Sequence, residues 1–156
     1  MQMAEDTPGL GDLDFAAVSP EEYARIVKGL SSREIGELAR DEALRARVVG
    51  EVFRRMEQQF RPDRAGELEA VIRWRIAGVT EAVYDVTVSG GTCAVREGRG
   101  EAKPRVTLDM GDEEFLNVTS GNAGPVKLFM TRKLKVTGDV ALALKLTSMF
   151  DIPKAD

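Results

Sequence analysis

The side chains that could carry out chemistry are few in this chain, and their types exclude the commonest catalytic arrangements. The 156-residue sequence contains no histidine and a single cysteine, Cys93. Without histidine the chain lacks both the usual general base and the usual metal ligand, and a lone cysteine has no Cys–His pair to activate it. Cys93 stands at an inward position of an alternating segment, which favours a small buried thiol over a nucleophile. We therefore expect neither a metal ion nor another cofactor.

The remaining polar candidates have ordinary structural explanations. The acidic run at 112–114 could be a carboxylate cluster, but acids in the first turn of a helix also complement the helix dipole. The Gly-x-Gly at 98–100 is not followed by a helical pattern, so a nucleotide-binding loop is not expected. Lys133 and Lys135 share the outer face of a short strand. They could meet lipid head groups there, although a solvated sheet edge is the simpler interpretation.

Charge and hydropathy narrow the classes of partner. The net charge of −4 gives no electrostatic reason to expect a nucleic acid, and the mixed charges between residues 40 and 75 predict a solvated surface. No run of about eighteen apolar residues is present, so we expect no transmembrane segment and at most transient membrane contact. The acidic N-terminus lacks the apolar run of a secretory signal, and one cysteine suits a reducing compartment. These features predict a cytoplasmic location.

The N-terminal part is expected to be a polar tail followed by helices. Residues 1–18 are polar with scattered glycine and proline, which favours a flexible tail. Residues 19–66 carry repeated helix-start signals, with Ser19, Ser31 and Asp41 at the cap positions. The third of these helices has an apolar side chain at every fourth position, namely Leu44, Val48, Val52, Met56 and Phe60.

Residues 67–156 are expected to contain the sheet and the later helices. Apolar and polar side chains alternate in five segments, at 72–76, 84–88, 93–95, 106–110 and 133–136. Short turns join the first three segments, which predicts an antiparallel meander. Helix-start and helix-stop residues delimit three further helices, at 112–120, 125–130 and 139–150.

What remains is a set of apolar side chains that form either a plain core or the wall of an apolar ligand cavity. The last helix is apolar on nearly all sides, and a small sheet covers only one side of a helix. Methionines supply adaptable walls of the kind that loosely selective apolar sites use. The candidate lining residues are Trp74, Tyr84, Val86, Val88, Leu108, Met110, Phe115, Leu116, Phe129, Met130, Val136, Leu142, Leu146, Met149 and Phe150. Periodicity alone does not separate a core from a cavity wall.

An ordered series of short motifs in the C-terminal half resembles a known family. The series comprises Pro-Arg-Val-Thr-Leu at 104–108, the acidic helix start at 112–116, Ser-Gly-Asn at 120–122, Phe-Met-Thr at 129–131, Lys-Leu-Lys-Val at 133–136 and Gly-Asp at 138–139. It is similar to the sterol carrier protein 2 family over residues 70–153. That family usually has glycine where this chain has Arg132, so the turn before the 133–136 segment is expected to differ.

The resemblance implies a fold and a function. The fold is α+β, with about five mainly antiparallel strands, an N-terminal helical segment and later helices that close an apolar pocket. The expected domain covers residues 19–156, with helices over 19–66 and the sheet and pocket helices over 67–156. The implied function is non-covalent binding or transfer of a sterol, a fatty acid or an acyl-CoA-like molecule. The pocket would be lined by the fifteen residues named above.

Two alternatives stay open. A cyclase or isomerase would fold an apolar biosynthetic intermediate in the same cavity and use Tyr84, Asp85 or Asp109 as its acid or base, because burial can raise the pKa of a carboxyl group. An interaction module without a ligand would dimerise through the long helix at 44–60. A monomer and a homodimer are both compatible with the sequence.

Overall fold

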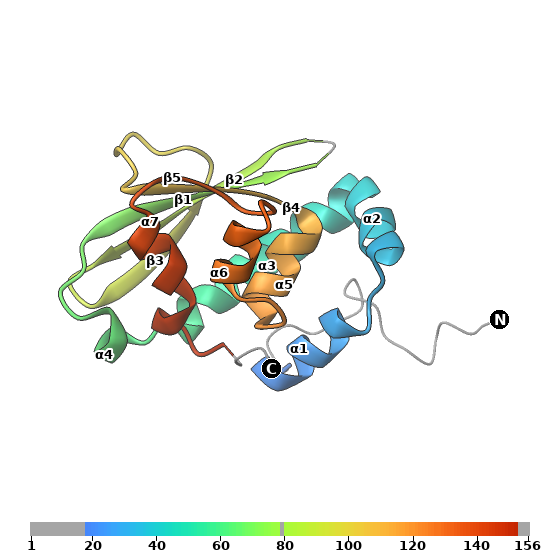
Figure 1. Ribbon diagram of the computed structural model, residues 1–156, viewed down its shortest axis with the longest axis horizontal. Helices are drawn as coiled ribbons and strands as arrows, with labels where there is room; N and C mark the ends of the chain where they lie inside the picture. The colour runs from blue at the N-terminus through green and yellow to red at the C-terminus, as the bar shows by residue number, and fades with distance from the viewer. Residues whose placement is uncertain (1–17, 79, 153–156) are drawn as a thin grey trace.

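The computed structural model describes residues 18–78 and 80–152, so the predicted flexible tail lies outside the described residues except for Val18. Four helices come first: α1 (Pro20–Lys28), α2 (Ser32–Arg40), α3 (Glu42–Gln59) and α4 (Pro62–Ala65). The remaining elements are β1 (Ala70–Ala77), β2 (Ala82–Ser89), β3 (Thr92–Glu97), β4 (Val106–Gly111), α5 (Asp112–Ser120), α6 (Pro125–Met130), β5 (Lys135–Gly138), α7 (Val140–Lys145) and a 3-10 turn (Leu146–Met149). Figure 1 shows the five-stranded sheet with the helices packed beside it.

The first three helices begin at the predicted caps. The Ser19 hydroxyl accepts a hydrogen bond from the Glu22 amide at 3.1 Å. Ser31 and Glu34 form a reciprocal capping box, with bonds of 3.1 and 3.0 Å. Asp41 caps α3 in the same way. Each cap satisfies backbone N–H groups that have no partner inside the helix, which fixes the turns between α1, α2 and α3.

The sheet has the strand order β3-β2-β1-β4-β5. The first three strands form the predicted antiparallel meander, and β4 pairs with β5 antiparallel as well. The mainly antiparallel α+β fold predicted from the sequence is therefore confirmed. One pairing is parallel: β4 lies beside β1, with Trp74 opposite Leu108. The sequence gives no local signal that β4 lies beside β1. After β3 the chain must cross one face of the sheet to reach the side of β1 opposite β2.

The crossing segment is held on the sheet face that points away from the helices. Arg73 donates two hydrogen bonds to Asp85, at 2.8 and 3.0 Å, and a third to the carbonyl oxygen of Gly100 at 3.1 Å. The Gly100 amide in turn donates to Asp85 at 2.8 Å. Burial acts to raise the pKa of Asp85, but these hydrogen bonds and the Arg73 charge outweigh it, so the pKa lies below its usual value. The ion pair thus fixes the path that makes β4 parallel to β1.

The helix-facing side of the sheet forms the core. Nine inward side chains of the three central strands are buried, namely Ile72, Trp74, Ile76, Tyr84, Val86, Val88, Val106, Leu108 and Met110. Helix α3 supplies the opposite wall with Val48, Val49, Val52, Phe53 and Met56. The predicted last helix over 139–150 begins at its Asp139 cap but tightens into the 3-10 turn at Leu146.

The end of the described chain is fastened to the end of α3. Phe60 and Phe150 form an isolated antiparallel bridge, and their rings lie 5.7 Å apart. The Arg61 amide donates to the Met149 carbonyl, and the Asp151 amide donates to the Gln59 carbonyl, both at 2.7 Å. The segment after α7 is therefore held by backbone hydrogen bonds as well as by side-chain packing.

The predicted solvated surface between residues 40 and 75 is wrong for three arginines. Arg45, Arg55 and Arg73 are buried, with exposed fractions of 5%, 8% and 9%. Each has found acceptors inside the protein: Arg55, for example, donates to the Val18 carbonyl at 2.6 Å. A charge pattern reports which residues are charged and not which of them have partners, so sequence alone does not identify the buried ones.

Candidate functional site

Four aromatic rings from three elements meet at the centre of the core. Phe53 of α3 stacks on Tyr84 of β2, with ring centroids 4.2 Å apart, and meets Trp74 of β1 edge-on at 5.6 Å. Phe115 of α5 lies 5.1 Å from Phe53 and 5.9 Å from Trp74. We call these residues the aromatic cluster. Offset-stacked and edge-on arrangements are the ones that aromatic pairs prefer, so these contacts stabilise the four rings at the centre of the core.

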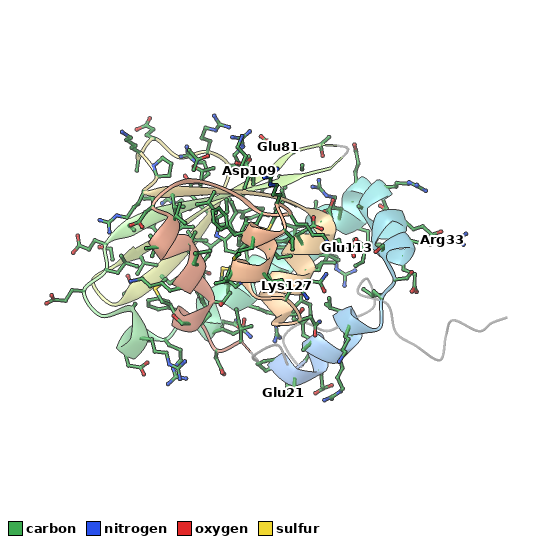
Figure 2. All side chains as sticks on the ribbon, viewed as in Figure 1. Glu21, Arg33, Glu81, Asp109, Glu113 and Lys127 are labelled. Carbon is green, nitrogen blue, oxygen red and sulfur yellow. The ribbon has the colours of Figure 1, made fainter. Side chains whose placement is uncertain are left out.

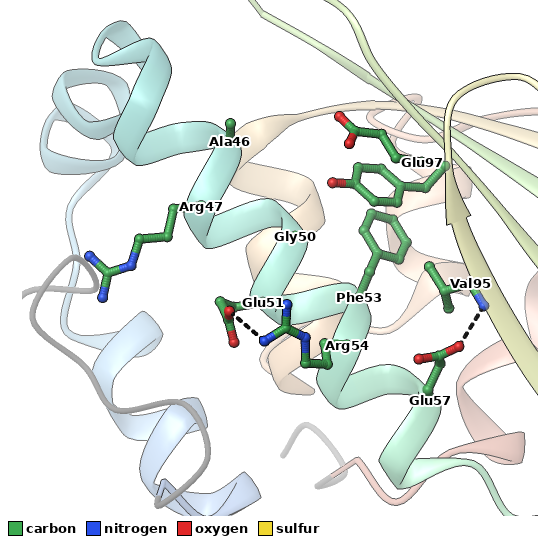
Figure 3. Close-up of a pocket in the computed structure, with 10 residues that line it drawn as sticks. Ala46, Arg47, Gly50, Glu51, Phe53, Arg54, Glu57, Val95 and Glu97 are labelled. Atoms are coloured by element: carbon green, nitrogen blue, oxygen red, sulfur yellow. Dashed lines mark hydrogen bonds and ion pairs between the residues drawn. The ribbon is translucent and has the colours of Figure 1, made fainter.

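A groove of about 370 Å³ opens over the outer side of the aromatic cluster (Figure 3). It runs between α3 and the β2–β3 hairpin, and its lining residues are Ala46, Arg47, Gly50, Glu51, Phe53, Arg54, Glu57, Tyr84, Val95 and Glu97. Gly50 lies in the middle of α3, where glycine weakens a helix. A Cβ at this position would stand 3.4 Å from the Tyr84 hydroxyl. The glycine therefore keeps the groove open above that hydroxyl.

The rim of the groove is charged, and much of that charge is already paired. Arg54 and Glu51 form an ion pair at 2.9 Å on the exposed side of α3. Glu57 accepts a hydrogen bond from the Val95 amide at 2.8 Å, which ties the edge strand β3 to α3. Burial raises the pKa of Tyr84, and the nearby charge of Glu97 raises it further. The Tyr84 hydroxyl therefore stays protonated at neutral pH.

One buried polar atom has nothing to bind. Among the residues that the structure describes, Trp74 Nε1 is the buried side-chain nitrogen or oxygen without a hydrogen-bond partner. The Trp74 side chain is 1% exposed. Leaving a buried donor unsatisfied costs about 1–3 kcal/mol. Such a donor in a native protein is therefore expected to bond to an acceptor that is not part of the polypeptide. A ligand oxygen or a trapped water in the aromatic cluster would supply it.

The fifteen sequence-predicted lining residues are only partly brought together. All but three are buried, and Trp74, Tyr84 and Phe115 meet in the aromatic cluster. Phe129 and Val136 are half-buried, and Met130 is 74% exposed. The others form the surrounding core, from Val86 and Val88 on the sheet to Leu142 and Leu146 of the C-terminal segment.

Sequence reasoning did not single out the groove on α3. Phe53 was visible only as one more apolar position of a long amphipathic helix, and nothing in its spacing shows that it stacks on Tyr84. Gly50 carried a usable signal, because an isolated glycine inside a helical pattern marks a close approach or an opening. Glu57 carried no such signal, because its role depends on the position of β3, whose Val95 amide it binds.

The acid and base groups of the enzyme alternative lie on opposite faces of the sheet. Tyr84 points toward the helices, whereas Asp85 and Asp109 alternate with buried neighbours and point the other way. Asp85 is bound to Arg73, and Asp109 pairs with Arg75 at 3.1 Å. Because both carboxylates are separated from the aromatic cluster by the sheet, they are not positioned to exchange a proton with a ligand held there.

We predict that Asp109→Asn and Asp85→Asn each leave the affinity for an apolar ligand within a few-fold of the wild type. The physical reason is that these carboxylates lie on the face of the sheet opposite the aromatic cluster, where the ligand is expected. Isothermal titration with a long-chain alcohol measures the affinity, and circular dichroism checks that each variant is folded. A folded variant that had lost all binding would place a carboxylate in the site after all.

Cys93 should be chemically inert in the folded protein. Burial, together with the Glu57 charge, raises the pKa of its thiol to about 12. Since only the thiolate reacts, iodoacetamide at pH 8 should modify Cys93 more than ~100-fold faster in urea than in the native state. Mass spectrometry of timed samples gives both rates. Equal rates in the two states would show that the thiol is accessible and ionised, and would contradict the predicted inert role.

Metal-binding clusters and membrane-spanning helices are both absent from the described residues. Within residues 18–78 and 80–152, no group of three or more histidine, cysteine or acidic side chains is arranged to hold a metal ion. In the same part of the chain, no helix is long and apolar enough to cross a membrane.

Comparison with known proteins gives two kinds of likeness. The chain is 24% identical over 141 residues to hydroxysteroid dehydrogenase-like protein 2 of Danio rerio, covering 90% of this chain and 34% of that protein. It is 31% identical over 103 residues to peroxisomal multifunctional enzyme type 2 of Mus musculus, covering 65% of this chain and 14% of that protein. The chain thus spans about a third of the first relative and less of the second.

A solved structure shares the fold. The solution structure of palmitated SCP2L2 from Aedes aegypti superposes with a TM-score of 0.52 at 19% identity, covering 67% of this chain and 96% of that one. The model of the SCP-2 sterol transfer family matches residues 50–151, from the middle of α3 to just beyond Phe150. The match takes in most of the groove, the aromatic cluster and the whole sheet. This chain therefore belongs to the SCP-2 sterol transfer family.

Proposed function

We propose that this protein binds an apolar small molecule without covalent chemistry and releases it elsewhere, as a lipid carrier does. The observation that carries the proposal is the aromatic cluster beneath an open groove, with the unpartnered N–H of Trp74 in its midst. Membership of a family described as sterol transfer supports the same function. So does the fatty acyl ligand named for the Aedes aegypti structure.

The groove and the cluster suggest how a ligand enters. Phe53 belongs to both, since it lines the groove and stacks within the cluster. A modest rotation of this one side chain would join the groove to Trp74. The groove volume falls at the lower end of the range of about 300–1,000 Å³ that small-molecule sites occupy. An acyl chain or sterol would fill the space that Phe53 vacates and would take up its ring contacts.

The energetics suit a carrier. Burying about fourteen methylene groups at ~0.8 kcal/mol each gives roughly 11 kcal/mol. Association costs at least about 4 kcal/mol, which leaves about 7 kcal/mol. That corresponds to a dissociation constant on the order of ten micromolar, and one hydrogen bond to Trp74 brings it toward the micromolar range. A ligand held this way is bound specifically enough to carry and weakly enough to release.

The polar contact also favours a class of ligand. An indole N–H donates and cannot accept, so it prefers a hydroxyl, ester or carbonyl oxygen. An ionised carboxylate would have to be desolvated among aromatic rings, which is costly without a cation beside it. We therefore expect sterols, fatty alcohols and acyl esters to place their oxygen at Trp74. Fatty acids would instead leave their carboxylate at the groove rim.

Displacement of a fluorescent fatty acyl probe tests the proposed function. We expect saturable probe binding and competition by sterols, long-chain alcohols and long-chain acids. Trp74 is the one tryptophan in the chain, so its own emission reports whether a ligand reaches the aromatic cluster. A probe that bound without saturation, and a Trp74 spectrum unchanged by every lipid class, would reject the proposal.

Trp74→Phe should separate the hydrogen bond from the apolar contacts. Phenylalanine keeps most of the ring packing and removes the donor. We expect the affinity for a long-chain alcohol to fall about 3- to 10-fold, as for one lost hydrogen bond, while the affinity for the alkane of equal length changes much less. Isothermal titration of both ligands measures the ratio. Equal losses for alcohol and alkane would mean that Nε1 does not contact the ligand.

A further inference from the structure

Three polar side chains stand in one row across the helix-facing side of the sheet. Trp74 of β1 is the register partner of Tyr84 of β2, and Tyr84 is the partner of Glu97 at the end of β3. Register partners on neighbouring strands project to the same side and lie about 5 Å apart. We call these three residues the polar row. It begins in the core at Trp74, which is 1% exposed, and reaches the surface at Glu97.

The inward rows on either side of the polar row are apolar. On one side Ile72 lies opposite Val86, which in turn lies opposite Val95. On the other side Ile76 lies opposite Ala82. Polar groups that face a core are costly unless they are paired. Their alignment in a single row that leads out to the groove therefore indicates a polar partner for the row.

The Tyr84 hydroxyl reaches the groove without a partner. The Tyr84 side chain is 8% exposed and lines the groove. Within the described residues its hydroxyl takes part in no hydrogen bond, whereas a tyrosine buried to this degree usually has one. Tyr84 and Trp74 thus supply two unpartnered donors on adjacent strands, one at the groove and one inside the aromatic cluster.

Glu97 gives the polar row a negative end. The five described strands carry three acidic residues, of which Asp85 and Asp109 face away from the helices. Asp109 lies near the top of Figure 2 with Glu81, on the side of the sheet away from α5 and α6. Glu97 instead shares the side of Tyr84 and lines the groove. Because a carboxylate accepts hydrogen bonds and repels anions, this end of the row favours a ligand hydroxyl over a ligand carboxylate.

We propose that the polar row selects a neutral lipid whose head group has a carbonyl and a hydroxyl oxygen close together, as in a monoacylglycerol. The inference rests on the proposed function and names the ligand class of the same site. Trp74 donates to the ester carbonyl, Tyr84 donates to a neighbouring oxygen, and Glu97 accepts from a hydroxyl at the mouth of the groove. The oxygens of a glycerol ester are a few bonds apart, which suits donors on strands about 5 Å apart. The acyl chain lies toward Leu108, the apolar register partner of Trp74 on its other side.

Competition against the fluorescent fatty acyl probe tests the polar row. Monomyristoylglycerol, methyl myristate and myristate share one acyl chain and differ in the head group. We expect monomyristoylglycerol to bind about 3- to 10-fold more tightly than methyl myristate, as for one added hydrogen bond. Myristate should bind more weakly than either at low salt and should gain affinity as salt screens the charge of Glu97.

Two variants assign the selectivity to residues of the row. Tyr84→Phe removes the hydroxyl and keeps the ring that stacks on Phe53. It should lower the affinity for monomyristoylglycerol about 3- to 10-fold and leave that for methyl myristate within about two-fold. Glu97→Gln should strengthen myristate binding about 2- to 5-fold, because it removes a repulsive charge. The matched control Glu101→Gln removes an exposed carboxylate from the crossing segment between β3 and β4, and should leave all three affinities unchanged.

Gly50→Ala provides a second test of the Tyr84 hydroxyl, which decides the matter if Tyr84→Phe does not fold. The added Cβ would stand 3.4 Å from that hydroxyl and would crowd a ligand oxygen bound to it. We expect the affinity for monomyristoylglycerol to fall more than that for methyl myristate, while the melting temperature rises because alanine favours a helix. Equal losses for the two lipids in each folded variant would overturn the role given to Tyr84.

The outcomes separate this inference from the proposed function. Saturable binding of all three lipids with equal affinity would overturn the polar row and leave the carrier function standing. A preference for monomyristoylglycerol that survived both Tyr84→Phe and Glu97→Gln would also overturn it, since the selectivity would then arise elsewhere. If the probe itself did not saturate and no lipid displaced it, the proposed function would fail and this inference with it.

Discussion

Phe53→Ala should lower the free energy of unfolding by about 3–5 kcal/mol, because it removes a fully buried ring and leaves a cavity lined by other rings. Phe53 is 1% exposed and touches Tyr84, Trp74 and Phe115 at the centre of the aromatic cluster. Urea unfolding followed by circular dichroism measures the loss. On the proposed ligand path this cavity would join the groove to Trp74, so a folded Phe53→Ala protein should bind bulkier ligands than the wild type does.

The control for this prediction is Phe60→Ala. Phe60 is half-buried and its ring packs against that of Phe150. Phe60→Ala should therefore lower the free energy of unfolding clearly less than Phe53→Ala does. Phe53→Leu keeps an apolar side chain and serves for ligand experiments if the alanine variant does not fold. Equal costs for the Phe53 and Phe60 alanine variants would mean that Phe53 is not the centre of the core. An unaltered ligand preference in Phe53→Leu would count against the proposal that Phe53 separates the groove from Trp74.

Arg45→Ala should lower the free energy of unfolding by a similar amount, about 3–5 kcal/mol, for a different reason. The Arg45 guanidinium is buried and donates to Asp112 at 2.7 Å, to the Thr80 carbonyl at 2.7 Å and to the Ile76 carbonyl at 3.0 Å. It thereby joins α3, α5 and the end of β1. Alanine would leave a partly buried carboxylate and two carbonyl groups without their partner, which is the costly way to break a buried ion pair. Urea unfolding again supplies the measurement.

An exposed arginine on the same helix provides the comparison. Arg54 pairs with Glu51 at 2.9 Å with its side chain 66% exposed, so Arg54→Ala should change stability by no more than about 1 kcal/mol. Gly78→Ala offers a second probe of the Arg45 site, because a Cβ there would stand 2.8 Å from the Arg45 guanidinium nitrogen. If Arg45→Ala and Arg54→Ala were equally mild, the buried hydrogen bonds of Arg45 would contribute little to the fold.

The sequence predicts those parts of the fold whose cause is local. The caps Ser19, Ser31 and Asp41 were identified because a cap acts on amides two or three residues away. The strands were identified because alternation follows directly from one buried face. The motif series from 104 to 139 identified the family because it records a whole arrangement of elements in order.

The parts that sequence reasoning missed depend on distant residues. The parallel β1–β4 pair follows from a crossing segment held by Arg73 and Asp85, and no local signal announces that contact. Met130 was placed in the pocket because it is apolar, but α6 is only 6 residues long, too short for periodicity to show which side faces water. The groove needs α3 and β3 to meet, which is again a property of the assembled fold.

The central claim is that the apolar interior of this protein takes up one lipid molecule. Native mass spectrometry of the purified protein, before and after incubation with a long-chain fatty alcohol, tests it most directly. We predict a single adduct of one ligand per chain that appears with increasing ligand, is displaced by cholesterol, and is weakened by Trp74→Phe. A spectrum that shows only the bare chain at every ligand concentration would contradict the claim. So would adducts whose number per chain keeps rising with ligand and does not level off at one.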